Sequence, residues 1–137
     1  MRNQIFYVAK EEIELLKKRL ATASDTYVME LDGKSIQTEA EYVREMDIQL
    51  KVPYGFPPDM VLSWYYDDIT RCIWIEESHI VLIIRSFESM LKDYPKVKSN
   101  IIDDFNEITL PWWGGDIVGH LVGGSPKEFL VYLEVEK

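Results

Sequence analysis

Short apolar runs alternate along the chain with segments in which apolar residues recur every three or four positions. The runs at residues 27–31, 78–85 and 129–135 predict strands, and residues 5–8 form either a short strand or an irregular packed arm. The run at 78–85 is apolar without alternation, which is typical of a parallel strand covered on both faces.

Helical periodicity marks residues 10–20, a segment that begins at Thr38, and another that begins at residues 95–96. Thr38 and Glu41 form a capping box, in which Thr38 is the N-cap and the Glu41 side chain returns to the Thr38 amide. Ser86 is the expected cap of a further short helix. The residues expected to face inward are Ile13, Leu16 and Leu20 in the first helix, Ala40, Val43, Met46 and Leu50 in the second, and Val97, Ile101, Ile102, Phe105 and Ile108 in the last. Strands that alternate with helices predict right-handed crossovers and a small parallel sheet, an α/β fold.

The last predicted helix is followed by a tryptophan pair and a glycine-rich stretch. Residues 111–115 are expected to close the helix, and Trp112 and Trp113 are expected to pack inside. Residues 116–125 are expected to form a packed loop with little regular structure.

Length and charge narrow the class of protein. A chain of 137 residues with 47% hydrophobic residues is expected to fold as one domain. The net charge is −9, and because residues 1–34 hold six acids and six bases, the whole excess lies in residues 35–137. Such a surface repels nucleic acid and anionic lipid and attracts basic partners. No apolar run has the length of a membrane span. The single cysteine, Cys72, excludes an intramolecular disulfide framework, so we expect a cytoplasmic protein.

Candidate metal and catalytic residues are few. His79 and His120 lack ligand partners at the usual spacing, and neither a phosphate-loop nor a dinucleotide fingerprint is present, so no metal or cofactor is expected. A two-carboxylate hydrolase is the enzymatic alternative. Its candidate acid and base are Asp59, Asp67, Asp68 and Glu107. Acids on one helix face form a row, however, whereas a substrate must lie between them, so we expect no enzymatic activity.

Residues 54–70 carry the most informative pattern in the chain. They predict a loop that runs into a short helix, whose start is marked by Pro57, Pro58 and Asp59. One face of this helix carries Asp59, Ser63, Tyr66, Asp67 and Thr70, and the opposite face carries Val61, Trp64, Tyr65 and Ile69. Most acidic stripes are solvated helix surface. Here Tyr54, Gly55 and Phe56 precede the helix, and a mixed aromatic and charged surface is typical of protein recognition.

The order of these segments resembles the barstar family, small intracellular inhibitors of ribonucleases. The resemblance rests on Asp-Gly-Lys-Ser-Ile at 32–36 after a strand, the capped helix from Thr38, Pro-Tyr-Gly at 53–55, Asp-Asp-Ile-Thr at 67–70, and the apolar strand that follows. It covers residues 27–137 and leaves residues 1–26 as an N-terminal extension. It implies a barstar-like three-stranded parallel sheet packed on helices, with an extra helical segment at the N-terminus.

The resemblance also implies a binding mode, in which an acidic helix plugs the active site of a ribonuclease with two carboxylates one turn apart. Those positions correspond either to Asp59 and Ser63 or to Ser63 and Asp67, so Ser63 replaces one family acid in both alignments. The family asparagine after Tyr-Gly is replaced by Phe56-Pro57-Pro58. A further family acid corresponds to Glu107. The expected partner-binding residues are Tyr54, Gly55, Asp59, Ser63, Tyr66, Asp67, Thr70 and Glu107.

These observations predict an inhibitor or immunity protein, an antitoxin that binds a basic ribonuclease or toxin and occludes its active site. The alternative is a barstar-fold adaptor or regulator whose basic partner is not a nuclease. The departures at Ser63 and at residues 56–58 predict a different cognate enzyme or docking register. A monomer is expected.

Overall fold

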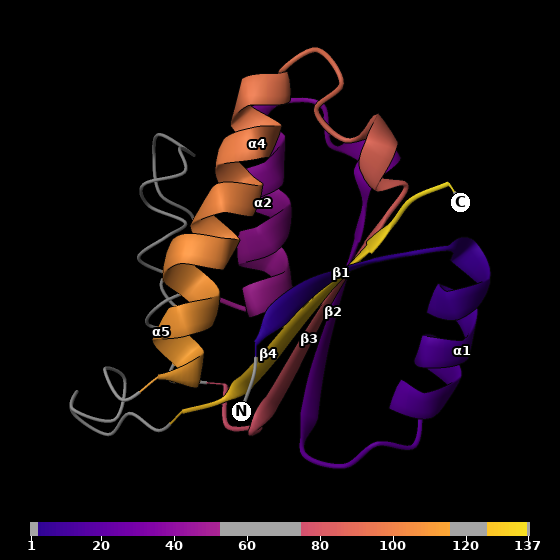
Figure 1. Cartoon of the computed structure of the whole chain (residues 1–137), viewed down its shortest axis with the longest axis vertical. Coiled ribbons are helices and arrows are strands. Elements are labelled where there is room, and N and C mark those ends of the chain that lie inside the picture. Colours follow the sequence, from indigo (N-terminus) through magenta and orange to yellow (C-terminus); the bar gives the residue numbers. More distant parts are fainter. Residues whose placement is uncertain (1–2, 53–74, 116–125, 137) are drawn as a thin grey trace.

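One four-stranded parallel sheet forms the centre of the molecule (Figure 1). The computed structural model describes residues 3–52, 75–115 and 126–136. The strands are β1 (Gln4–Val8), β2 (Thr26–Asp32), β3 (His79–Arg85) and β4 (Glu128–Glu134). They lie in the order β1-β4-β3-β2, and every neighbouring pair is parallel. The molecule is therefore an α/β protein, as the alternation of strands and helices predicted.

A three-stranded sheet was expected, but the described sheet has four strands. Residues 4–8 form a regular edge strand, not an irregular arm, and pair with β4 from Gln4 opposite Leu130 to Val8 opposite Glu134. The Asn3 side chain fixes the start of this strand, since its amide donates to the carbonyls of Leu110 and Lys127 and its oxygen accepts the Phe129 N–H. The extension thus contributes a strand as well as the predicted helix.

Helices cover both faces of the sheet. Helix α1 (Lys10–Leu20) lies on one face, and α2 (Glu39–Leu50), α4 (Pro95–Asp104) and α5 (Leu110–Gly114) lie on the other (Figure 1). The chain crosses the sheet in one direction from β1 to β2 and returns through β3 to β4. Right-handed crossovers in opposite directions must lie on opposite faces, which explains why α1 lies on the face opposite the other described helices.

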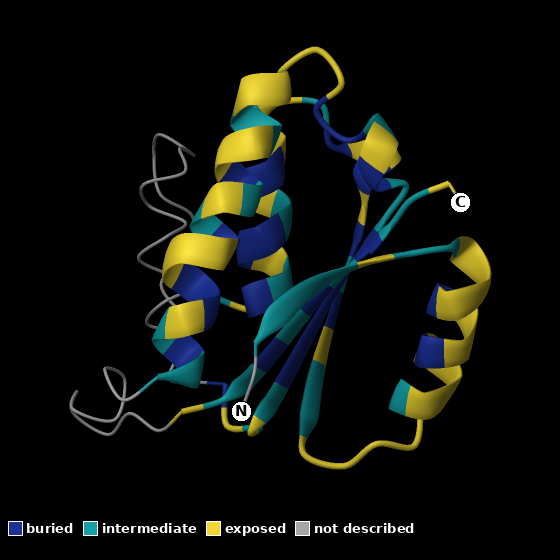
Figure 2. Cartoon of the chain, in the orientation of Figure 1, coloured by how far each residue is buried: buried dark blue, intermediate teal, exposed yellow. Residues whose placement is uncertain are grey.

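The core has two unequal parts (Figure 2). The larger part lies between the sheet and the described helices α2, α4 and α5, and it includes Tyr42, Phe105 and Trp113. The smaller part joins Ile13 and Leu16 of α1 to Val81 and Ile83 of β3. Strand β3 is buried from Ile80 to Ile84 and contributes to both parts, as predicted for a strand covered on two faces.

The predicted helix at residues 10–20 is confirmed, with Ile13 and Leu16 buried and Leu20 partly buried. The Thr38 N-cap is also confirmed, because its Oγ1 accepts the Glu41 N–H at 3.1 Å. The second half of the capping box was wrong, since the Glu41 carboxylate accepts the N–H of Gln37.

Ala40 was wrongly expected to face inward, because it is exposed. The buried stripe of α2 is Tyr42, Val43, Met46 and Leu50. At 100° per residue, Ala40 lies about 100° from the centre of that stripe.

The turn after β2 approaches the end of β3 closely. Asp32 Oδ1 accepts the Lys34 N–H at 3.0 Å and opens a short 3-10 helix, η1 (Gly33–Ser35). A Cβ atom at Gly33 would lie 2.5 Å from the Ser86 carbonyl oxygen. Glycine at this position therefore allows the ends of the two strands to meet.

The last helical segment contains a π-helical turn, η3 (Phe105–Thr109), between α4 and α5. In this turn the Leu110 N–H donates to the Phe105 carbonyl five residues earlier. The extra residue shifts the helical phase, so Leu110 and Trp113 are buried whereas Ile108, expected inside, is 45% exposed. Pro111 has no N–H to donate, and the π-turn ends two residues before it, at Thr109.

The helix closes within residues 111–115, as expected, because α5 ends at Gly114. The expectation for Ser86 fails. Ser86 has left-handed backbone angles and its side chain caps no helix; a short 3-10 helix, η2 (Phe87–Ser89), follows it. The expected loop at 116–125 lies outside the described residues.

Trp113 is fully buried, as expected, and its truncation tests the packing of the larger core. We expect Trp113→Ala to lower the free energy of unfolding by about 3–5 kcal/mol, because it removes a large buried ring and leaves a cavity. Urea denaturation followed by circular dichroism measures the loss. Trp112, which is only partly buried, provides the matched control, and Trp112→Ala should cost distinctly less. Equal losses would show that the two rings contribute equally to the core.

Candidate functional site

The predicted recognition segment falls almost wholly outside the described residues. Those residues are Tyr54, Gly55, Asp59, Ser63, Tyr66, Asp67 and Thr70. The structure therefore does not place them, and they remain predictions from the sequence. Glu107 is described: it lies on the π-turn η3 and is exposed, and its side chain makes no hydrogen bond or ion pair to a described residue. Its carboxylate is accessible to a partner.

The residues on either side of segment 53–74 show where it is attached. Helix α2 runs antiparallel to the strands and ends at Leu50, at the amino edge of the sheet (Figure 1). The chain is described again from Ile75, which is buried and precedes β3. Residues from both attachment points line one pocket of about 220 Å³ together with Tyr27 of β2. The described residues that flank the segment, Lys51 and Ile75, therefore lie close together beside Tyr27 of β2.

Tyr27 and α2 make this attachment firm. The Tyr27 hydroxyl donates to the Gln49 carbonyl, and the Gln49 side-chain oxygen accepts the Glu30 N–H at 3.1 Å. Lys51 adopts left-handed backbone angles as the helix ends, and its Nζ lies 5.7 Å from the centroid of the Tyr27 ring. The end of α2 is thus tied to the sheet at the point where the predicted recognition segment begins.

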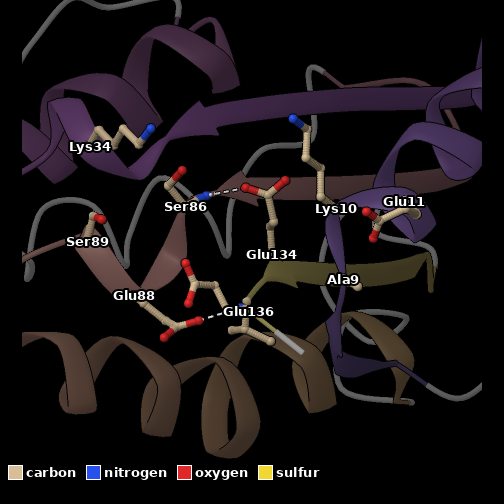
Figure 3. Close-up of a pocket in the computed structure, with 10 residues that line it drawn as sticks. Ala9, Lys10, Glu11, Lys34, Ser86, Glu88, Ser89, Glu134 and Glu136 are labelled. Carbon is tan, nitrogen blue, oxygen red and sulfur yellow. Dashed lines mark hydrogen bonds between the residues drawn. The ribbon is translucent and has the colours of Figure 1, made fainter.

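A larger pocket lies at the opposite, carboxyl edge of the sheet (Figure 3). Its volume is about 560 Å³, and it is lined by Ala9, Lys10, Glu11, Lys34, Ser86, Glu88, Ser89, Glu134, Val135 and Glu136. These residues follow the carboxyl ends of all four strands. Ligands of open parallel sheets commonly bind at this edge. Sequence analysis did not identify this pocket, although each lining residue lies at or just after the end of a strand, and that position is the signal that could have found it.

Glu134 in this pocket holds the ends of β3 and β4 together. Its two oxygens accept the Ser86 N–H at 2.8 Å and Arg85 Nε at 2.9 Å. Arg85 also donates to Glu14 of α1 at 2.9 Å and lies 3.7 Å from Glu30 of β2. Arg85 therefore connects α1 and two strands to the end of β3.

The pocket is lined by both acidic and basic side chains, but they do not form a recognisable catalytic group. Lys10 and Lys34 lie on its rim with four glutamates, and the Arg85 guanidinium already neutralises one of these, Glu134. The lining residues include no histidine or cysteine, so Ser86 has no imidazole partner there. Within the described ranges no three side chains are grouped to hold a metal ion. The lining thus supplies neither a nucleophile with its base nor a concentrated phosphate site.

The Glu134 contacts predict a dependence of stability on pH. Burial alone would raise the pKa of Glu134, but the Ser86 N–H and the Arg85 guanidinium together hold this pKa below its ordinary value. A depressed carboxyl pKa contributes stability at pH values above the unfolded pKa, about 4.3, and that contribution is lost as pH falls through the folded pKa. We expect Glu134→Gln to lower the free energy of unfolding at pH 7 by about 1–3 kcal/mol.

Glu134→Gln should also make the free energy of unfolding depend less steeply on pH in the acid range. Urea denaturation at a series of pH values from neutral to acid measures both effects. Glu136→Gln is the control, because Glu136 lines the same pocket but is exposed. If Glu134→Gln and Glu136→Gln behaved alike, the contacts of Glu134 would contribute no measurable stability.

Comparison with known proteins gives no relative. No protein-family model, no curated protein and no solved structure matches the chain. Among the described residues, none of the helices is long and apolar enough to cross a membrane.

Proposed function

We propose that this protein is an inhibitor or immunity protein that binds a basic ribonuclease, with the acidic segment 54–70 occupying the active site of that enzyme. The observation that carries the proposal is the composition of this segment, in which carboxylates, hydroxyls and aromatic rings share one predicted helix face. Glu107, exposed on η3, is a candidate for an additional contact.

The arrangement of the described elements supports the proposal. Strands β2, β3 and β4 lie side by side in chain order, and the described helices that connect them lie on one face. The barstar resemblance rests on an order of elements that the described residues also have. This order is the Asp32-Gly33 turn, the capped helix α2 and then the buried strand β3. In this interpretation β1 and α1 are an addition to a barstar-like unit that spans residues 27–137.

The described residues that flank the segment also support a binding role. Lys51 and Ile75 lie close together at the amino edge, where Tyr27 ties α2 to the sheet. Holding both ends reduces the conformational entropy that a binding segment loses when it docks.

The mechanism follows from charge. Active sites that hold RNA phosphates are lined with cationic side chains, and carboxylates spaced by about 6 Å along a helix can take the place of those phosphates. The net charge of −9 attracts a basic enzyme, which raises the association rate and makes it sensitive to salt. Inhibition then results from occlusion of the RNA site.

Affinity capture tests this proposal. The tagged full chain is used as bait in an extract of its own cell, bound proteins are identified by mass spectrometry, and ribonuclease activity is assayed before and after addition of the pure protein. We expect a basic ribonuclease that is inhibited in proportion to the amount added. A basic partner without nuclease activity would favour the adaptor or regulator instead. Turnover of RNA by the protein alone would contradict both.

A further inference from the structure

The carboxyl-edge pocket lies where the path of the chain reverses. Strand β1 continues into α1 on one face of the sheet, whereas the chain after β3 passes to α4 on the other face (Figure 1). Strand β4 lies between these two strands. The segments that follow β1 and β3 therefore diverge, and the pocket of about 560 Å³ lies beyond their carboxyl ends. In open parallel sheets a crevice at such a reversal is the usual place for a ligand, and the volume is that of a small-molecule site.

The charged side chains that line this pocket are only partly paired. Arg85 Nε lies 2.9 Å from the Glu134 carboxylate and neutralises it. Lys10 and Lys34 are exposed, and their ammonium groups make no hydrogen bond or ion pair to any described residue. The same holds for the Glu136 carboxylate within the described ranges. Charges of both signs are therefore available to a ligand.

The available charges are separated within the pocket. Figure 3 shows the ammonium groups of Lys10 and Lys34 on one side of Glu134. The carboxylates of Glu88 and Glu136 lie on its other side. Glu88 Oε1 accepts the Glu136 N–H, which fixes these two acids relative to each other. The pocket thus has a cationic side, formed by the two lysines, and an anionic side, formed by Glu88 and Glu136.

The start of α1 adds to the cationic side. Lys10 and Glu11 open this 11-residue helix, and their backbone N–H groups have no acceptor in the part of the chain that the structure describes. The N-cap residue, Ala9, has no side-chain oxygen to accept them. Unpaired N–H groups at a helix start carry partial positive charge and bind carboxylates. The Glu11 carboxylate lies far from Lys34 across the pocket (Figure 3), so it leaves the cationic side accessible.

We infer that the carboxyl-edge pocket binds a small zwitterion of the amino acid class, with its carboxylate on the cationic side and its ammonium on the anionic side. The lining itself selects this class. Its glutamates repel a polyanion such as a nucleotide, and its two lysines repel a polyamine. A molecule with one charge of each sign is attracted by both sides. Because it has no net charge, the chain's own net charge of −9 does not repel it.

This site is distinct from the proposed recognition segment. The described residues that flank that segment, Lys51 and Ile75, lie at the opposite, amino edge of the sheet. The zwitterion and the basic partner therefore bind independently, and each proposal can fail without the other. A ligand in the carboxyl-edge pocket joins the start of α1 to the residues that follow β3 and β4. Because it binds only the folded chain, it raises the thermal stability.

Thermal unfolding of the full chain with each standard L-amino acid tests the inference. At millimolar concentration we expect at least one amino acid to raise the Tm in a saturable way. Isothermal titration calorimetry should then give a Kd of about 1 mM or below. NMR signals of the backbone amides should shift at Ser86 and Glu136 and stay unchanged at Lys51. If no amino acid raises the Tm, or if the shifts lie away from the pocket, the inference is overturned.

Two variants that each remove one charge test which end of the ligand binds to which side. Lys34→Gln should raise the Kd of the amino acid by about 3-fold or more, and so should Glu136→Gln. The primary amide of the amino acid lacks the carboxylate charge, so Lys34→Gln should not weaken its binding further. The N-acetyl derivative lacks the ammonium charge, so Glu136→Gln should not weaken its binding further.

Lys96→Gln and Asp93→Asn are the matched controls, because they remove exposed charges outside the pocket. Each should bind the amino acid like the parent chain. Circular dichroism establishes that every variant is folded, and Lys10→Gln replaces Lys34→Gln in the comparison should the latter not fold. Controls that weaken binding as much as the pocket variants overturn the inference. So do an amide and an N-acetyl derivative that bind as tightly as the amino acid itself.

Discussion

If the proposed ribonuclease partner is the right one, replacing both Asp59 and Asp67 with alanine is expected to weaken binding to it by about 2–5 kcal/mol, or roughly 30- to 4,000-fold. The range is that for removing one partner of a buried, hydrogen-bonded charge pair, which leaves the other charge desolvated and unpaired. The loss should appear mainly in the dissociation rate. Surface plasmon resonance with the captured enzyme, at several salt concentrations, measures both rates.

A matched control separates this effect from the loss of net charge. Asp93→Ala/Glu136→Ala also changes the charge from −9 to −7, but it alters two exposed acids elsewhere in the described structure. We expect this control to lower only the association rate, and only slightly. The single variants Asp59→Ala and Asp67→Ala then decide which acid pairs with Ser63 in the family alignment. If the double variant bound like its control, segment 54–70 would not be the inhibitory element.

Deleting residues 1–25 is expected to abolish cooperative folding of the remaining chain. The deletion removes the β1–β4 ladder, the three Asn3 hydrogen bonds and the cover over Val81 and Ile83. Burial of Ile13 and Leu16 alone is worth about 1.5–3 kcal/mol each. With the ladder, the total approaches the whole net stability of a domain, about 5–15 kcal/mol. Far-UV circular dichroism and urea denaturation detect the loss of the cooperative transition.

Point variants in α1 show whether the effect arises from burial. Ile13→Ala in the full chain should cost about 2–5 kcal/mol, whereas Leu15→Ala on the same helix should be nearly neutral because Leu15 is 64% exposed. A fragment 26–137 that unfolds cooperatively at the same urea concentration as the full chain would contradict this prediction. Residues 27–137 would then be an independent domain with a dispensable extension.

Local patterns predicted most of the individual elements correctly. The stripe of Ile13, Leu16 and Leu20 identified α1, and the uninterrupted apolar run from Ile80 to Ile84 identified β3, because periodicity and burial are encoded in a few neighbouring residues. Errors arose where the outcome depended on distant contacts. Strand β1 is only five residues long, and its place beside β4 depends on a partner at the other end of the chain.

The burial of Ile108 failed for a different reason. A prediction with a constant 3.6-residue period cannot include the π-turn, and one additional residue per turn moves Ile108 to the surface. The carboxyl-edge pocket was missed for a similar reason to β1: Lys10, Lys34, Ser86 and Glu134 meet only after the strand order is known. The proposed recognition site in segment 54–70 is supported by the sequence pattern alone, because these residues lie outside the described structure.

The pairing of β1 with β4 has a consequence for how the chain reaches its native state. Val8 pairs with Glu134, which is synthesised near the end of the chain. During synthesis β1 therefore leaves the ribosome long before β4 has been made. Contacts so distant in sequence slow folding, and meanwhile the apolar side of α1 stays accessible to chaperones or to neighbouring nascent chains. Changes that weaken β4 should therefore reduce the yield of native protein from the cell more than they reduce the stability of the purified protein.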